Sequence, residues 1–274
     1  MQSALIYMLY FLQEEPVHNM KVKVLGAHNT ESRYTRLSGL IVDSVLALDA
    51  GSLTSTLSFR NQMKIKALLL THGHYDHIRD IPAFAMNLFL RKKSVDIYTH
   101  QAAADNLLRY FLDGGIYPEF HKSPKDEPTI RLHLLKELED VKILDYTVNP
   151  AQVAHAMPAM GYLITSSGKS FFYTGDTGPG LSQTWERVSP GVLFIELTAS
   201  DRWIESMRDH GHMTPSLLQQ ELSNFRSIKG YLPRIVCVHL NPAIEKEIRS
   251  EISSVSDALD APIELAHEGM LVEL

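Results

Sequence analysis

The segment THGHYDH at residues 71–77 places His72, His74, Asp76 and His77 within six consecutive positions. Three imidazoles and one carboxylate offer nitrogen and oxygen ligands, which suit zinc and other borderline cations. A lone histidine is usually a structural residue, but ionisable groups crowded this closely are most simply explained by a shared cation. We interpret the segment as half of a two-metal site.

The flanking residues predict how this segment is held. The apolar run Ala67 to Leu70 precedes it and indicates a buried strand, and apolar residues at helical spacing follow from Ile78 onward. His72 and His74 project from the same side of an extended strand end, so both can reach one ion. Asp76 and His77 come after the chain turns and can face a second ion.

Two metals need further ligands, and four other strand ends offer them. Each is a histidine or a carboxylate directly after an apolar run, namely His155, Asp176, Glu196 and His239. Such strand ends lie at one edge of a layered sheet structure. We therefore expect these side chains to converge on the first group.

With these elements in place, the sequence resembles the metallo-beta-lactamase superfamily. Its signature His-x-His-x-Asp-His is matched in full by residues 72–77. The segments GDTGP, FIELTAS, GHMTP and CVHLNP resemble the class II cyclic-nucleotide phosphodiesterases, and more distantly the tRNA 3'-processing endonucleases. The resemblance implies an α/β fold, a four-layer αββα sandwich with two facing sheets and helices outside.

The resemblance also implies roles for the site residues. The first metal would be bound by His72, His74 and His155, the second by Asp76, His77 and His239, with Asp176 bridging both. The cofactors would be two divalent cations, zinc first, with manganese or iron as alternatives. The catalytic residues would be His212, Glu196 and Asp76.

These roles predict a hydrolase that cleaves a phosphodiester, with a 3',5'-cyclic nucleotide as the preferred substrate. A hydroxide activated by two metals and oriented by Asp76 would attack phosphorus. His212, polarised by Glu196, would protonate the departing alkoxide, and His210 competes for this role. The sequence departs from the cyclic-nucleotide family at Tyr75, usually Leu, and at Asp80, usually Gly or Ser, so the substrate is predicted less firmly than the fold.

Two alternatives remain open. The same fold can act on a lactone, a thioester, a non-cyclic phosphodiester or an RNA 3' end, and a non-catalytic metal-binding protein can retain it. RNA is disfavoured by the formal net charge of -6. The tRNA enzymes usually carry a long arm between these motifs, and only 21 positions separate His155 from Asp176.

Composition sets the remaining expectations. A chain of 274 residues with 45% hydrophobic content can form one large domain, which we place at residues 20–274 after an N-terminal extension at 1–19. The single cysteine, Cys237, excludes a disulfide framework and favours a reducing, cytoplasmic setting. No segment predicts a membrane span or a signal peptide. The expected partner is a small phosphodiester, without nucleic acid or membrane, and a homodimer is compatible with the sequence.

Two further segments invite a role near the substrate. Residues 113–128 are rich in turn formers and predict a mobile flap, whose Tyr117, Phe120 and His121 either stack on a substrate or anchor the loop to the core. His28 is a candidate to border the pocket. For Trp185 and Trp203, core packing is the favoured use.

Overall fold

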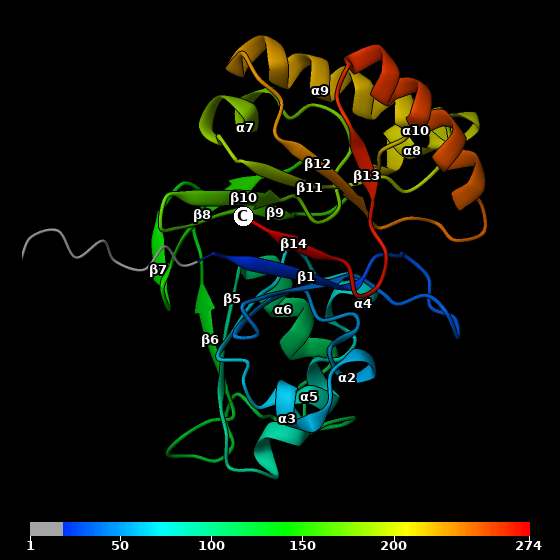
Figure 1. Ribbon diagram of the computed structural model, residues 1–274. Helices are drawn as coiled ribbons and strands as arrows, with labels where there is room; N and C mark the ends of the chain where they lie inside the picture. Colours follow the sequence, from blue (N-terminus) through cyan, green and yellow to red (C-terminus); the bar gives the residue numbers. More distant parts are fainter. Residues whose placement is uncertain (1–18) are drawn as a thin grey trace, which may run out of the picture.

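The computed structural model of this chain describes residues 19–274 (Figure 1). The predicted domain at 20–274 falls within these residues, whereas all but the last residue of the predicted extension lies outside them. Two seven-stranded sheets face each other, with helices on the outer face of each. The predicted αββα sandwich is confirmed. Among residues 19–274, no helix is both long and apolar enough to cross a bilayer.

The first sheet combines antiparallel and parallel strands. β14, β1, β2 and β3 pair antiparallel, and β3 to β6 pair parallel. In spatial order the strands are β14 (Leu271–Glu273), β1 (Lys21–Gly26), β2 (Gly39–Val42), β3 (Leu46–Leu48), β4 (Ala67–Leu69), β5 (Val95–Thr99) and β6 (Ile130–Leu134).

The second sheet has a similar division. β7 to β10 pair antiparallel and β10 to β13 pair parallel. A hairpin turn at Ser167 and Gly168 joins β9 to β10. In spatial order the strands are β13 (Ile263–Leu265), β12 (Arg234–Val238), β11 (Val192–Glu196), β10 (Lys169–Tyr173), β9 (Met160–Ser166), β8 (Tyr146–Gln152) and β7 (Val141–Ile143).

The helices form the outer layers (Figure 1). Those beside the first sheet are α2 (Leu53–Thr56), α3 (Phe59–Gln62), α5 (Ile81–Phe89) and α6 (Gln101–Tyr110). Those beside the second sheet are α7 (Ser182–Arg187), α8 (Ile204–His210), α9 (Pro215–Lys229) and α10 (Glu245–Leu259). Two short helices, α4 (Tyr75–Ile78) and η1 (Asp201–Trp203), lie next to the chain segments that carry the site.

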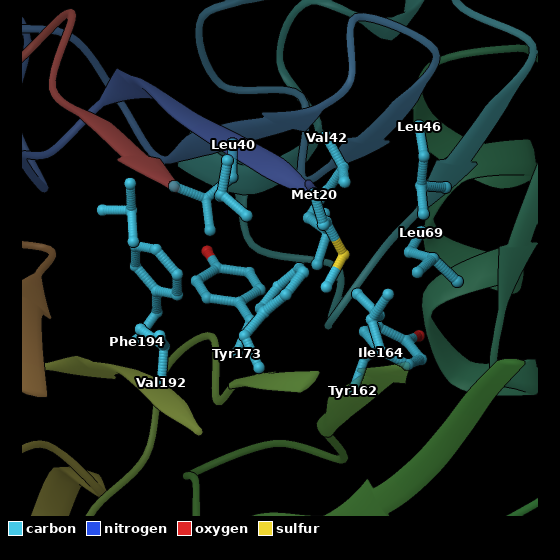
Figure 2. Packing of buried hydrophobic residues seen from close by; sticks show 14 of the residues in the cluster. Met20, Leu40, Val42, Leu46, Leu69, Tyr162, Ile164, Tyr173, Val192 and Phe194 are labelled. Carbon is cyan, nitrogen blue, oxygen red and sulfur yellow. The ribbon is translucent and has the colours of Figure 1, made fainter. Parts of the chain in front are cut away.

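The main core lies between the sheets. Strand alternation produces it: in β1, Val22 and Val24 are fully buried while Lys21 and Lys23 are exposed. Figure 2 shows Leu40 and Leu69 of the first sheet facing aromatic side chains of the second, among them Tyr173 and Phe194. Each such side chain contributes about 1.5 to 3 kcal/mol through burial. The two sheets are thereby held in a fixed relation.

This topology positions the site. β3 and β4 in the first sheet, and β10, β11 and β12 in the second, are parallel strands whose carboxyl ends lie at the same edge of their sheet. The segments that follow these strands carry most of the predicted ligands. Polar side chains distant in the sequence therefore meet at one edge of the sandwich.

Candidate metal centre and active site

The predicted metal loop follows β4 directly and ends in α4, which begins at Tyr75 with His74 as its N-cap residue. Gly73 is required between the two histidines, since a Cβ there would come within 2.7 Å of the Asn106 side chain. The loop therefore lies tightly against α6. The predicted placement, after a strand and before a helix, is confirmed.

The first group of ligand atoms joins both sheets. His72, His74, His155 and Asp176 each present one ligand atom, and these atoms lie within 4.8 Å of one another. Nδ1 of His74 is 3.0 Å from Nε2 of His72 and 3.2 Å from Nε2 of His155. Asp176 Oδ2 lies 3.6 Å from His72 Nε2. Three nitrogens and one oxygen thus face a common point.

A second group lies beside the first and shares Asp176 with it. The members are Asp76, His77, Asp176 and His239, again with ligand atoms within 4.8 Å. Oδ1 of Asp176 is 3.0 Å from His77 Nε2 and 3.4 Å from His239 Nε2. Asp76 Oδ2 is 3.0 Å from His239 Nε2. The two oxygens of Asp176 therefore serve different groups.

Two buried ligand atoms indicate whether divalent cations fit these two groups. His77 Nε2 and Asp176 Oδ1 are both inaccessible, and although they lie 3.0 Å apart, neither makes a hydrogen bond of acceptable geometry among the described residues. Buried polar atoms without partners are rare in proteins because they lose the hydrogen bonds that water provided. A divalent cation bound by both atoms would supply the missing interaction partner of each. The donor set fits the group that the fold implies.

Hydrogen bonds set the tautomer of four of the five histidines. Nδ1 of His155 donates to the backbone oxygen of Gly211 at 2.9 Å, and Nδ1 of His77 donates to Asp49 Oδ2 at 2.7 Å. Nδ1 of His72 lies 3.0 Å from the Thr71 hydroxyl, which itself donates to Asp49. These bonds leave the Nε2 lone pairs directed at the groups, as metal ligation requires.

Asp49 is a positioning residue that the sequence analysis missed. It is fully buried directly after β3, has a φ of 57°, and accepts hydrogen bonds from His77, Thr71 and Tyr173. Its φ lies in the region that non-glycine residues rarely adopt. The signal was present, since Asp49 is an acid immediately after an apolar run, as Asp176 is.

His239 completes the set of fixed tautomers. It also has a positive φ, 62°, at the end of β12. Its Nδ1 lies 2.8 Å from the Thr198 hydroxyl, which donates to Glu196, so Nδ1 donates to Thr198 and Nε2 faces the second group. Two residues with unusual backbone conformation, Asp49 and His239, thus lie at the site, where strain is often retained for function.

Glu196 also positions His212, as predicted. His212 Nδ1 lies 2.9 Å from Glu196 Oε1, and Glu196 is fully buried. Burial alone would lower the pKa of His212, but the neighbouring Glu196 carboxylate raises this pKa to about 9. His210 instead donates Nδ1 to the Ser206 backbone oxygen within its own helix. Of the two histidines, His212 is therefore the one that lines the cavity beside the ligand groups.

The charge states of the ligands follow from their surroundings. Burial, reinforced by the neighbouring His77, lowers the pKa of His72 well below its ordinary value. Burial would raise the pKa of Asp176, but His239 and His77 hold it well below its usual range. Burial would lower the pKa of His77 and of His239, but Asp176 and other nearby carboxylates raise it. Neutral imidazole and ionised carboxylate are the forms that bind metal, so a cation would displace a proton from these two histidines.

An open cavity of about 550 Å³ gives access to these groups. Its lining includes Asp76, Asp176, His239 and His212 at its base. His28 does not line it, because its ring is buried and pairs with Glu268 at 2.7 Å. The residues that follow His28 line the cavity instead, namely Asn29, Thr30 and Glu31.

A family model described as a beta-lactamase superfamily domain matches residues 40–239, more than half of the chain. The chain belongs to this superfamily. The predictions of metallo-beta-lactamase superfamily membership and of its fold are confirmed.

Two curated relatives within or near this superfamily are informative. A ribonuclease Z of Pyrococcus horikoshii is 30% identical over 109 residues, which cover 39% of this chain and 33% of the relative. A probable 3',5'-cyclic-nucleotide phosphodiesterase of Yersinia pestis is 23% identical over 227 residues, covering 72% of this chain and 64% of the relative. The chain thus spans less than two thirds of the length of either relative.

A solved structure supports the superfamily fold over nearly the whole chain. Unliganded yeast PDE1 has a TM-score of 0.81 and 17% sequence identity, and the match covers 93% of this chain and 99% of that one. At this identity the likeness concerns the fold.

The segment predicted to be a flap is anchored to the core at the far end of the first sheet. Phe120 is fully buried in the cluster beneath that sheet, and its backbone oxygen accepts from Ile130 where β6 begins. Ile130 pairs with Val95 at the start of β5, whereas the metal loop follows the opposite end of β4. The suggestion that Phe120 stacks on substrate is wrong, and core anchoring is its use.

The two tryptophans differ. Trp185 is fully buried, as predicted. Trp203 is 49% exposed, so the prediction of core packing is wrong for this residue.

Proposed function

We propose that this member of the superfamily hydrolyses a phosphodiester and that a 3',5'-cyclic nucleotide is its preferred substrate. The observation that carries the proposal is the pair of ligand groups sharing Asp176, with the His212–Glu196 pair beside them. Paired cation sites of this kind recur in enzymes that act on phosphate esters.

His72, His74 and His155 would hold one divalent cation, and Asp76, His77 and His239 the other, with Asp176 shared. When bound, the cations would lower the pKa of a water molecule and neutralise charge on the phosphate. We propose zinc, because five imidazoles and two carboxylates form the donor set, with manganese and iron as competitors.

The protein's own residues would donate the proton and orient the water that the reaction needs. Because its pKa is raised to about 9, His212 is doubly protonated near neutral pH, so it donates Nδ1–H to Glu196 and holds a second proton on Nε2 for the departing alkoxide. Glu196 is itself held by the Thr177 backbone N–H at 2.6 Å, so the pair is preorganised. Asp76, which is less buried than Asp176, would orient the attacking water.

Size and charge support a small substrate rather than RNA. The cavity of about 550 Å³ suits a mononucleotide, and the net charge of -6 disfavours a polyanion. Between His155 and Asp176 the chain forms only the β9–β10 hairpin, which leaves no arm to hold tRNA. The Yersinia pestis relative carries the name of a probable cyclic-nucleotide phosphodiesterase. The ribonuclease Z relative makes an RNA 3' end the second candidate.

The test is hydrolysis of 3',5'-cAMP by protein loaded separately with zinc and with manganese. Chromatography follows 5'-AMP, and bis(p-nitrophenyl) phosphate serves as a generic diester. The variant His72→Ala should be inactive, and His267→Ala, an exposed histidine outside both groups, is the matched control.

Each outcome has a separate meaning. Turnover of cAMP that is lost in His72→Ala supports the whole proposal. Cleavage of the generic diester alone rejects the cyclic-nucleotide substrate and leaves phosphodiester hydrolysis standing, with precursor tRNA tested next. Cleavage of lactones or thioesters but of neither diester would identify another esterase, and bound metal without turnover on any ester would indicate a binding protein.

A further inference from the structure

A second hollow of about 490 Å³ adjoins the metal cavity. Asn29 and His212 line both hollows, so a molecule held at the metal groups can extend into the second one. The rest of its lining comes from η1, α8 and the segments near Thr198 and Asn241. None of the metal ligands lines this hollow.

Trp203 supplies a flat aromatic surface there. It is the more exposed of the two tryptophans in the chain, with 49% of its surface accessible. The Arg202 guanidinium carbon lies 5.5 Å from the centre of its ring. Aromatic rings and guanidinium planes are the groups on which unpaired nucleobases stack in proteins.

Asn29 provides an independent sign of a ligand. Its side-chain oxygen is buried and has no hydrogen-bond partner among the described residues. The residue is held in place because its backbone N–H donates to Leu240 at 3.1 Å. A buried amide oxygen without a partner is costly, and a rotation of the Asn29 side chain toward the hollow that it lines would let an N–H donor on a ligand satisfy it.

The charge of the hollow also limits its occupant. Arg202 and His210 are among its lining residues, and the lining contains no aspartate or glutamate. Ring nitrogens and carbonyl oxygens of a nucleobase are acceptors, and its exocyclic amino group is a donor. The hollow therefore offers partners for both kinds of group and a surface for the ring.

We propose that this second hollow binds the base of a purine nucleotide, which stacks on Trp203 and donates a hydrogen bond to Asn29. The position of the phosphate at His212 rests on the proposed function, whereas the base subsite rests on the hollow itself. Trp203 and Asn29 are then specificity-determining residues.

Binding of product-like ligands tests the subsite without turnover. Isothermal titration calorimetry compares 5'-AMP with ribose 5-phosphate on the metal-loaded protein. The base should make 5'-AMP bind about tenfold more tightly. Addition of 5'-AMP should also change tryptophan fluorescence, which reports on Trp203 because Trp185 is fully buried.

Three variants refine this test. Trp203→Ala should reduce the advantage of 5'-AMP to less than about twofold, and Trp203→Phe should retain most of it because a ring remains. Asn29→Ala should reduce it by a few-fold. Phe59→Ala is the matched control, since Phe59 is 56% exposed and has Arg91 over its ring but lies in α3, outside the hollow.

Failure of the subsite and failure of the function are distinguishable. Equal binding of 5'-AMP and ribose 5-phosphate, or full retention of the advantage in a folded Trp203→Ala variant, would overturn the subsite even if diesters are cleaved. An advantage that Trp203→Ala abolishes would support the subsite even if neither diester is cleaved. If Trp203→Ala does not fold, Asn29→Ala decides between these results, because it should lose part of the advantage only if the subsite exists.

Discussion

The two halves of the metal site are built in different ways. In the first sheet, four ligands lie within residues 72–77, so a single loop after β4 delivers them. In the second sheet, His155, Asp176 and His239 follow the alternate strands β8, β10 and β12, and they meet only because these strands end at the same edge of one sheet. The loop half is thus local in sequence, whereas the strand-end half depends on the complete fold.

Asp176 is where the two halves depend on each other most. Replacement by Asn removes the charge that both groups share, so bound metal should fall and phosphodiester turnover should drop about 10³-fold or more. Elemental analysis and kinetics on the same sample measure both effects. The control is Asp96→Asn on β5, which breaks an ion pair with Arg131 of β6 and should retain metal and activity. Retention of full metal content in Asp176→Asn would show that the two groups are independent.

His212 tests whether the strand-end half contributes chemistry beyond ligation. His212→Ala should reduce kcat about 10²-fold, the usual contribution of a general acid, while metal content stays near normal. The parallel variant His210→Ala should have little effect on kcat. Loss of metal from His212→Ala would instead identify His212 as a ligand.

Asp49 tests how far the loop half depends on support from outside the loop. Asp49→Asn weakens the acceptor for His77, Thr71 and Tyr173, and second-layer changes of this kind cost about 10- to 100-fold in metal affinity or activity. Competition with a chromophoric chelator measures the affinity. Unchanged affinity would mean that the local loop positions its ligands alone.

Metal removal tests how much the bound cations, which join the two halves, stabilise the folded protein. Chelation should lower the free energy of unfolding by about 3 kcal/mol when the metal had been present at about a hundred times its dissociation constant. Thermal unfolding before and after chelation, with metal re-addition as the control, measures the change. Far-ultraviolet circular dichroism should change little, because the strands that carry the ligands also form the core. Loss of secondary structure would show that metal maintains the fold.

Cys237 gives the smallest expected effect and probes β12, the strand that delivers His239. The thiol is fully buried, and burial raises its pKa well above the ordinary value. A disulfide reagent should therefore leave Cys237 unmodified in the native protein and modify it after unfolding. Rapid native modification would mean that the strand-end half opens readily.

The same contrast explains what the sequence could predict. The loop ligands could be predicted because their spacing is local in the sequence. Asp176 and His239 could be predicted because each follows an apolar run. Thr198 was not, since its contact with His239 needs the pairing of β11 with β12. Trp203 was predicted to pack in the core because most tryptophans do. Its exposure at the second hollow depends on tertiary packing, which the sequence does not show. Asp49 had the same strand-end signal as Asp176, and only the structure revealed its bond to His77.

The pairing of β14 with β1 has a practical consequence for handling the protein. Leu274 donates its backbone N–H to Met20 at 3.0 Å, and Glu273 pairs with Lys21 where β1 begins. The metal groups lie at the opposite end of the sandwich, where β1 ends and the cavity residues Asn29 and Thr30 follow. A surface tether attached beside β14 at this edge would therefore orient the cavity toward the solution, which suits immobilised assays.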